Sequence, residues 1–131
     1  MNKAEFLQPL TESGYLRTFD SEIDCLTENE LLVRGRMHDH RFSIEHTWRL
    51  KTPEYEVLDA SARQFAGDIE EKLCQNYSRI QGVRIGRGFS KRVLGELGEG
   101  KGRREHLHLA IEMARVGQQV YQFPAEFEAQ F

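Results

Sequence analysis

The sequence predicts one α+β domain, in which an antiparallel β-meander of three to five strands packs one face against two or three C-terminal helices. Two observations predict this class. Residues 40–50 alternate between apolar and polar side chains, as a strand with one buried face does. Residues 103–118 instead carry apolar side chains at helical spacing. Because strand patterns come first and helical patterns later, we expect residues 14–62 to form the sheet and residues 1–131 one domain.

The strand candidates are residues 15–19, 31–37 and 40–50. Apolar residues occupy odd positions in the second candidate and even positions in the third. This change of parity predicts a turn or bulge at His38-Asp39-His40, so residues 30–50 form a hairpin. After a turn at Pro53, residues 55–62 fit either a third strand or the start of a helix. We favour a strand, because the strong strand before it needs an antiparallel neighbour.

Helical patterns follow. Residues 67–80 place apolar side chains at spacings of four, four and three, which predicts a helix. Glycine-rich turns at Gly86 and Gly88 precede a short helix candidate. Three glycines between residues 98 and 102 predict a loop, since each would destabilise a helix by about 1 kcal/mol. The 103–118 helix comes next, with a broad buried face.

The two ends of the chain differ in character. Residues 1–13 are polar and mixed, which predicts a flexible arm. The aromatic tail, residues 121–131, packs back on the sheet or meets a partner chain, and the second alternative predicts a homodimer. The first residues lack the apolar segment of a signal peptide, and no run approaches the roughly 20 apolar residues of a membrane span. We therefore expect a cytoplasmic protein with no membrane contact.

The two cysteines, Cys25 and Cys74, form no disulfide framework, and we expect reduced, partly buried thiols. The formal net charge of −3 hides an asymmetry. Residues 1–78 carry 15 acidic against 9 basic side chains, whereas residues 79–131 carry 6 against 9. The local basic excess favours an anionic ligand, although a solvated helix face has the same composition. A nucleic-acid partner is disfavoured, because such binders are basic overall.

Glycines before a helix let backbone amides approach an anion, and basic side chains beside them hold its charge. The candidate ligand-binding residues are Arg84, Arg87, Gly88, Ser90 and Arg104. The full Gly-x-Gly-x-x-Gly pattern is absent, because position 91 is Lys. The alternative is a tight turn between an apolar segment and a helix, with no ligand.

Histidines and a carboxylate suggest a second site. Two histidines with an aspartate are a known ligand set for zinc or non-haem iron. The candidate metal ligands are His38, Asp39, His40 and His106. The alternative is ordinary hydrogen-bonded histidines, with His40 and His46 on the core side of a strand.

The segments Arg34–Asp39, Gly82–Phe89 and His106-Leu107 together resemble the bacterial domain-of-unknown-function family 2889. The resemblance spans roughly residues 14–122 and lies in the order and spacing of short motifs. The family pattern has a cysteine where this chain has Arg104, and a second near Asp68–Glu70. If cysteines and histidines of that family form a metal or thiol site, the resemblance implies that this chain lacks the thiolate part. The family has no established activity, so the resemblance informs the fold more than the function.

No nucleophile motif and no carboxylate in an apolar stretch indicates a particular reaction or a cofactor. The leading hypothesis is a binding module for a small anionic ligand or a protein partner. It would use residues 84–106, facing the turn at residues 38–40. The rival hypothesis is a metal-dependent enzyme with a His/Asp site.

Overall fold

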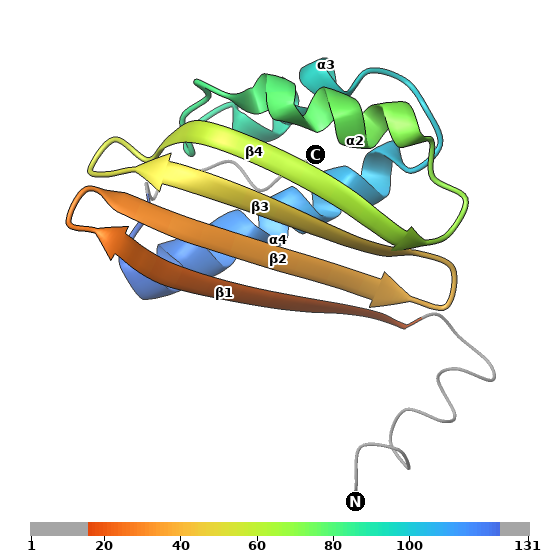
Figure 1. Ribbon diagram of the computed structural model, residues 1–131, viewed down its shortest axis with the longest axis horizontal. Coiled ribbons are helices and arrows are strands. Elements are labelled where there is room, and N and C mark those ends of the chain that lie inside the picture. The colour runs from red at the N-terminus through yellow and green to blue at the C-terminus, as the bar shows by residue number, and fades with distance from the viewer. Residues whose placement is uncertain (1–15, 124–131) are drawn as a thin grey trace, which may run out of the picture.

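A computed structural model describes residues 16–123. Four strands form one antiparallel sheet in the order β1-β2-β3-β4, which confirms the predicted meander (Figure 1). The strands are β1 (Arg17–Thr27), β2 (Glu30–Asp39), β3 (Ser43–Lys51) and β4 (Glu56–Ala66). The helices of residues 16–123 lie on one face of this sheet, so the fold is the predicted α+β class.

Alternation decides which strand residues face the helices. Val33 and Met37 of β2 are fully buried, and so are Ile44 and Trp48 of β3. The odd-to-even change of parity falls at the β2–β3 turn, as predicted. There the Asp39 carboxylate accepts hydrogen bonds from the backbone amides at 41 and 42, each at 2.7 Å. The aspartate therefore closes the turn that aligns the two core faces.

Strand β1 is longer than the sequence suggested. The 15–19 candidate continues through the polar residues to Thr27, and its partners run from Arg17 opposite Asp39 to Thr27 opposite Glu30. The polar composition misled the prediction because β1 is an edge strand whose outer side chains face solvent. Backbone pairing to β2 forms the ladder whichever side chains face outward.

The helices are α2 (Glu71–Tyr77), followed by the 3₁₀ turn η1 (Ser78–Ile80), then α3 (Phe89–Leu97) and α4 (Arg103–Tyr121). The predicted 67–80 helix begins late because Gly67 adopts φ +114°, a conformation that ends β4 rather than starting a helix. Helix α4 crosses the sheet over β2, where Gly35 lets it approach. A Cβ at Gly35 would lie 2.6 Å from the Met113 sulfur.

The glycine-rich segment, residues 82–88, is fixed to the start of β4. The amide of Val57 donates to the Val83 carbonyl at 2.8 Å, and the Ile85 amide donates to the Tyr55 carbonyl at 2.9 Å. A single bridge joins Glu56 and Arg84. The segment 83–85 is thus a short addition to the sheet edge, and it holds the following turn in a defined place.

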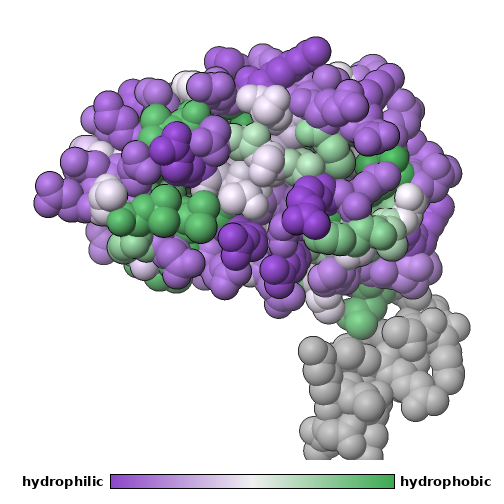
Figure 2. Space-filling view, in the orientation of Figure 1, coloured by the Kyte–Doolittle hydropathy of each residue, from purple (hydrophilic) through white to green (hydrophobic). Residues whose placement is uncertain are grey.

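The outer face of the sheet is polar, and hydrophilic residues cover most of it in Figure 2. Cross-strand ion pairs follow one another over this face: Glu22 with Arg34, Arg36 with Glu45, and Arg49 with Asp59. Within residues 16–123, no helix has the length and apolar character that a membrane crossing requires.

The first part of the aromatic tail packs on its own chain. Phe123 is 2% exposed and its ring lies 4.4 Å from that of Tyr55. The Tyr55 hydroxyl donates to the Tyr121 carbonyl at 2.8 Å. Residues 124–131, and with them the predicted dimer contact, lie outside the described residues, as does the predicted arm at 1–13.

Candidate functional sites

A small hollow lies between the glycine-rich segment and α3, with a volume of about 270 Å³. We call it the arginine hollow. It is lined by Gly82, Val83, Arg84, Arg87, Gly88, Phe89 and Arg92. Three guanidinium groups therefore surround one depression, and no carboxylate is among its lining residues.

The backbone shapes the arginine hollow. Gly82 and Gly88 adopt φ +88° and +81°, which side-chain-bearing residues rarely do. Gly88 is also the N-cap of α3, and no side chain caps that helix start. The positive end of the helix dipole thus faces the same region as the arginines, an arrangement that favours an anion.

The three arginines differ in the hydrogen bonds and ion pairs that they form within the protein. The Arg84 Nε donates to the Glu54 carbonyl at 3.4 Å, and Arg92 lies 4.0 Å from Glu96. Arg87 is exposed and forms no ion pair or hydrogen bond with any part of the chain that the structure describes. Arg87 is therefore the guanidinium most available to a ligand.

The structure divides the predicted ligand-binding set. Arg84, Arg87 and Gly88 line the arginine hollow together. Ser90 is 4% exposed and is not a lining residue. Arg104 lies at the start of α4, in a different and larger pocket.

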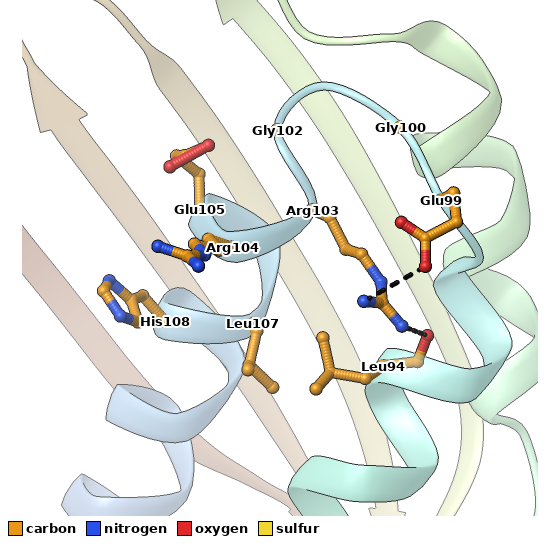
Figure 3. Close-up of a pocket in the computed structure, with 9 residues that line it drawn as sticks. All are labelled: Leu94, Glu99, Gly100, Gly102, Arg103, Arg104, Glu105, Leu107 and His108. Atoms are coloured by element: carbon orange, nitrogen blue, oxygen red, sulfur yellow. Dashed lines mark hydrogen bonds and ion pairs between the residues drawn. The ribbon is translucent and has the colours of Figure 1, made fainter. Parts of the chain in front are cut away.

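That pocket, between α3 and α4, has a volume of about 730 Å³. Its lining comprises Leu94, Glu99, Gly100, Gly102, Arg103, Arg104, Glu105, Leu107 and His108. In Figure 3 the Arg103 side chain runs between the helices, where it donates to the Leu94 carbonyl at 3.0 Å and pairs with Glu99 at 3.5 Å. Two arginines and two glutamates line the pocket, so its formal charges cancel.

The predicted metal ligands do not converge. His38 is exposed and hydrogen-bonds the Ser43 hydroxyl at 2.7 Å, and His40 is exposed in the same turn. Asp39 is engaged by that turn and by Arg17, 3.2 Å away. His106 is 0% exposed in the core.

Arg17 links that turn to the start of α4. Beside its contact to Asp39, its guanidinium lies 3.6 Å from Glu105 and 2.7 Å from the Nδ1 of His108. The turn at residues 38–40 and the α4 start therefore meet through an arginine that the sequence analysis did not single out. Arg17 lies in the middle of the weak 15–19 strand pattern, and no sequence motif around it indicated a site.

A buried histidine pair occupies the centre of the fold. The Nε2 of His46 on β3 and the Nδ1 of His106 on α4 lie 2.8 Å apart and share one hydrogen bond. Both side chains are 0% exposed, and their rings are parallel within 1°. The Nδ1 of His46 is buried without a hydrogen-bond partner. Cys74 on α2 completes the cluster, with its sulfur 3.9 Å from the His106 Nε2.

Burial sets the protonation of this cluster. It lowers the pKa of His46 well below the usual value, and the neighbouring His106 lowers that pKa further. Burial likewise lowers the pKa of His106 to about 4. Burial raises the pKa of the partly exposed Cys74 thiol, and Glu71 adds to that rise. Both imidazoles are thus neutral and the thiol protonated at neutral pH.

Tyr77 and Trp48 pack beside the pair. The Tyr77 ring lies 3.9 Å from that of His46, and the Trp48 indole donates to the Tyr77 hydroxyl at 2.6 Å. Sequence periodicity could place His46 on the core face of its strand, and Leu107 and Ile111 in a helical stripe. It gave no reason to join His46, Cys74 and His106, which are far apart in the chain.

Cys25 differs from the expectation of a partly buried thiol, because it is exposed. It lies on the edge strand β1, near the C-terminal end of α4, where its sulfur is 4.0 Å from the Tyr121 hydroxyl. Within the described residues, no three histidine, cysteine, aspartate or glutamate side chains are grouped so that they could hold a metal ion.

Comparison with known proteins adds no assignment: no family model matches the chain, and no curated protein or solved structure is significantly similar to it. The resemblance to the domain-of-unknown-function family 2889 stays a prediction.

Proposed function

We propose that this protein is a binding module for a small anionic ligand, which it holds in the arginine hollow. The observation that carries the proposal is the charge of the lining. Arg84, Arg87 and Arg92 contribute three positive charges to one depression, whose lining holds no carboxylate; of the three, Arg92 has an ion-pair partner, Glu96 at 4.0 Å. An anion there gains charge-assisted hydrogen bonds, which are about twice as strong as neutral ones.

The size of the hollow supports a single anionic group. A volume of about 270 Å³ is below the range of roughly 300–1,000 Å³ typical of pockets that enclose whole drug-sized molecules. A phosphate or carboxylate group fits it, and the rest of a larger ligand would extend into solvent. None of the lining residues is a nucleophile or a general base, which favours binding over catalysis.

The larger α3–α4 pocket supports this function less well. Arg103 is already engaged by Glu99 and by a backbone carbonyl, and the pocket's formal charges cancel. An anion there would meet two carboxylates. Arg104 of this pocket therefore serves as a control for the proposal rather than as part of it.

The test is a titration of isotope-labelled protein with inorganic phosphate, followed by NMR at low salt. We expect amide shifts confined to residues 82–92. The substitution Arg87→Ala should weaken binding roughly tenfold or more, since it removes a hydrogen bond to a charged group worth about 1.5–3 kcal/mol. Arg104→Ala removes the same charge from the protein and should leave the affinity within twofold.

Two results would contradict the proposal. One is phosphate binding that R87A and R104A weaken equally, which would indicate attraction by net charge alone. The other is shifts that centre on the α3–α4 pocket instead of residues 82–92.

A further inference from the structure

We propose that Cys74 and His106 form a binding site for a monovalent, thiophilic d¹⁰ metal ion, of which Cu⁺ is the biological example. The site is separate from the arginine hollow and uses a sulfur and a nitrogen that converge from α2 and α4. Thiolate and imidazole are the ligands that such soft ions prefer.

The distance between the two ligand atoms fits a shared ion. The Cys74 sulfur and the His106 Nε2 are 3.9 Å apart, which is long for a direct hydrogen bond. With the bond lengths known for Zn²⁺ as a guide, about 2.3 Å to sulfur and about 2.0 Å to nitrogen, an ion bridges up to about 4.3 Å. The observed separation lies within that limit, so an ion can bridge the two atoms in a bent arrangement.

His46 supplies the outer support that a metal-binding histidine needs. With an ion on the His106 Nε2, the ring's proton stays on Nδ1 and is donated to the His46 Nε2, 2.8 Å away. Such a second hydrogen bond fixes the tautomer and the orientation of a ligating imidazole. Tyr77 packs on the His46 ring and holds it in turn. His46 is thus a positioning residue rather than a ligand.

Charge favours a monovalent ion over a divalent one. Binding breaks the Cys74 S–H bond, forms an S–metal bond and releases one proton to solvent, so thiolate and monovalent ion sum to zero. A divalent ion would leave a net positive charge beside fully buried Leu73 and His106, which is costly. Two protein ligands also suffice for a d¹⁰ monovalent ion, whereas Zn²⁺ in structural sites takes four.

The chain contains its own control. Cys74 is partly exposed, and its sulfur lies beside His106. Cys25 is more exposed, and its sulfur lies beside the Tyr121 hydroxyl, 4.0 Å away, rather than beside a histidine. A comparison of the two single-thiol proteins separates a built site from the general affinity of thiols for soft metals.

The experiment uses the full chain, reduced and without oxygen. Cu⁺ is supplied from a competing coloured chelator such as bicinchoninate, and Ag⁺ is the redox-stable second probe in native mass spectrometry. We expect Cys25→Ser protein, which retains Cys74, to bind one ion at least tenfold more tightly than Cys74→Ser protein. Adding His46→Gln to C25S should weaken binding roughly tenfold to a hundredfold, as loss of an outer-shell partner does.

X-ray absorption on the Cu⁺-loaded C25S protein gives a readout that needs no further substitution. One sulfur and at least one nitrogen ligand are expected. Equal affinity of the two single-thiol proteins, a coordination shell of sulfur alone, or tighter binding of Zn²⁺ than of Cu⁺ would each overturn the proposal.

Discussion

The C-terminal end of α4 provides a sharp test of the packing. Gly117 faces Phe123, and a Cβ at position 117 would lie 2.6 Å or less from three ring atoms of that side chain. Neither partner can move aside cheaply, because position 117 is in a helix and Phe123 is 2% exposed. The substitution Gly117→Ala must therefore displace the ring.

The expected cost follows from two opposing effects. Expelling a buried phenylalanine side chain costs about 1.5–3 kcal/mol. Replacing a helical glycine by alanine gains about 1 kcal/mol. We expect G117A to lower the free energy of unfolding by about 0.5–2 kcal/mol.

Urea denaturation followed by tryptophan fluorescence measures this change, because Trp48 is the one tryptophan in the chain and is fully buried. Gly95 is the matched control. It is also helical, but a Cβ there meets nothing within 4 Å, so G95A should raise stability by up to about 1 kcal/mol. In a Phe123→Ala background the clash is absent, and Gly117→Ala should then stabilise as well. If G117A alone stabilises the protein as G95A does, the expected clash between the Cβ at position 117 and the Phe123 ring does not occur.

Two further predictions concern buried and turn-forming polar groups. Tyr77→Phe leaves the buried Trp48 N–H without its acceptor and should lower the free energy of unfolding by about 1–3 kcal/mol at pH 8. Burial raises the pKa of Tyr77 well above its usual value, so the unfolded state loses this proton first. The stability that the wild type gains from the protonated, buried Tyr77 is complete below about pH 10 and is lost as the pH rises further. The free energy of unfolding should therefore fall more steeply between pH 9 and 11 in the wild type than in Y77F. Equal slopes would contradict the assignment. Asp39→Ala removes two acceptor contacts in the β2–β3 turn together with the ion pair to Arg17, and should cost at least about 1–2 kcal/mol. Asp59→Ala, in an exposed ion pair, should stay within about 0.5 kcal/mol. Thermal melts of both variants measure the difference. Equal decreases in melting temperature would contradict the special role of Asp39 in the turn.

The strands could be predicted where one buried face makes apolar and polar residues alternate along the sequence. The β2–β3 hairpin has one fully buried face, so its parity, and the turn where that parity changes, could be derived from the sequence. Strand β1 lies at the edge and has no fully buried residue among those described, so its sequence carries little alternation signal. The late start of α2 could not be foreseen, since Gly67 looks like any helix-flanking glycine until its backbone conformation is known.

The two candidate sites also differ in how far they could be predicted from the sequence. The arginine hollow is local: its lining residues fall between positions 82 and 92, and the density of glycine and arginine there marked it. The cluster of His46, Cys74 and His106 joins a strand to two helices, and only the crossing of α4 over the sheet brings it together. That crossing depends on Gly35, a glycine in a strand where sequence rules predict only a weak position or a close approach. Long-range sites of this kind arise from helix placement, which single-sequence periodicity does not encode. A glycine on the core face of a strong strand is nevertheless a usable signal, because it indicates where a helix comes closest and which side chains can meet across the layers.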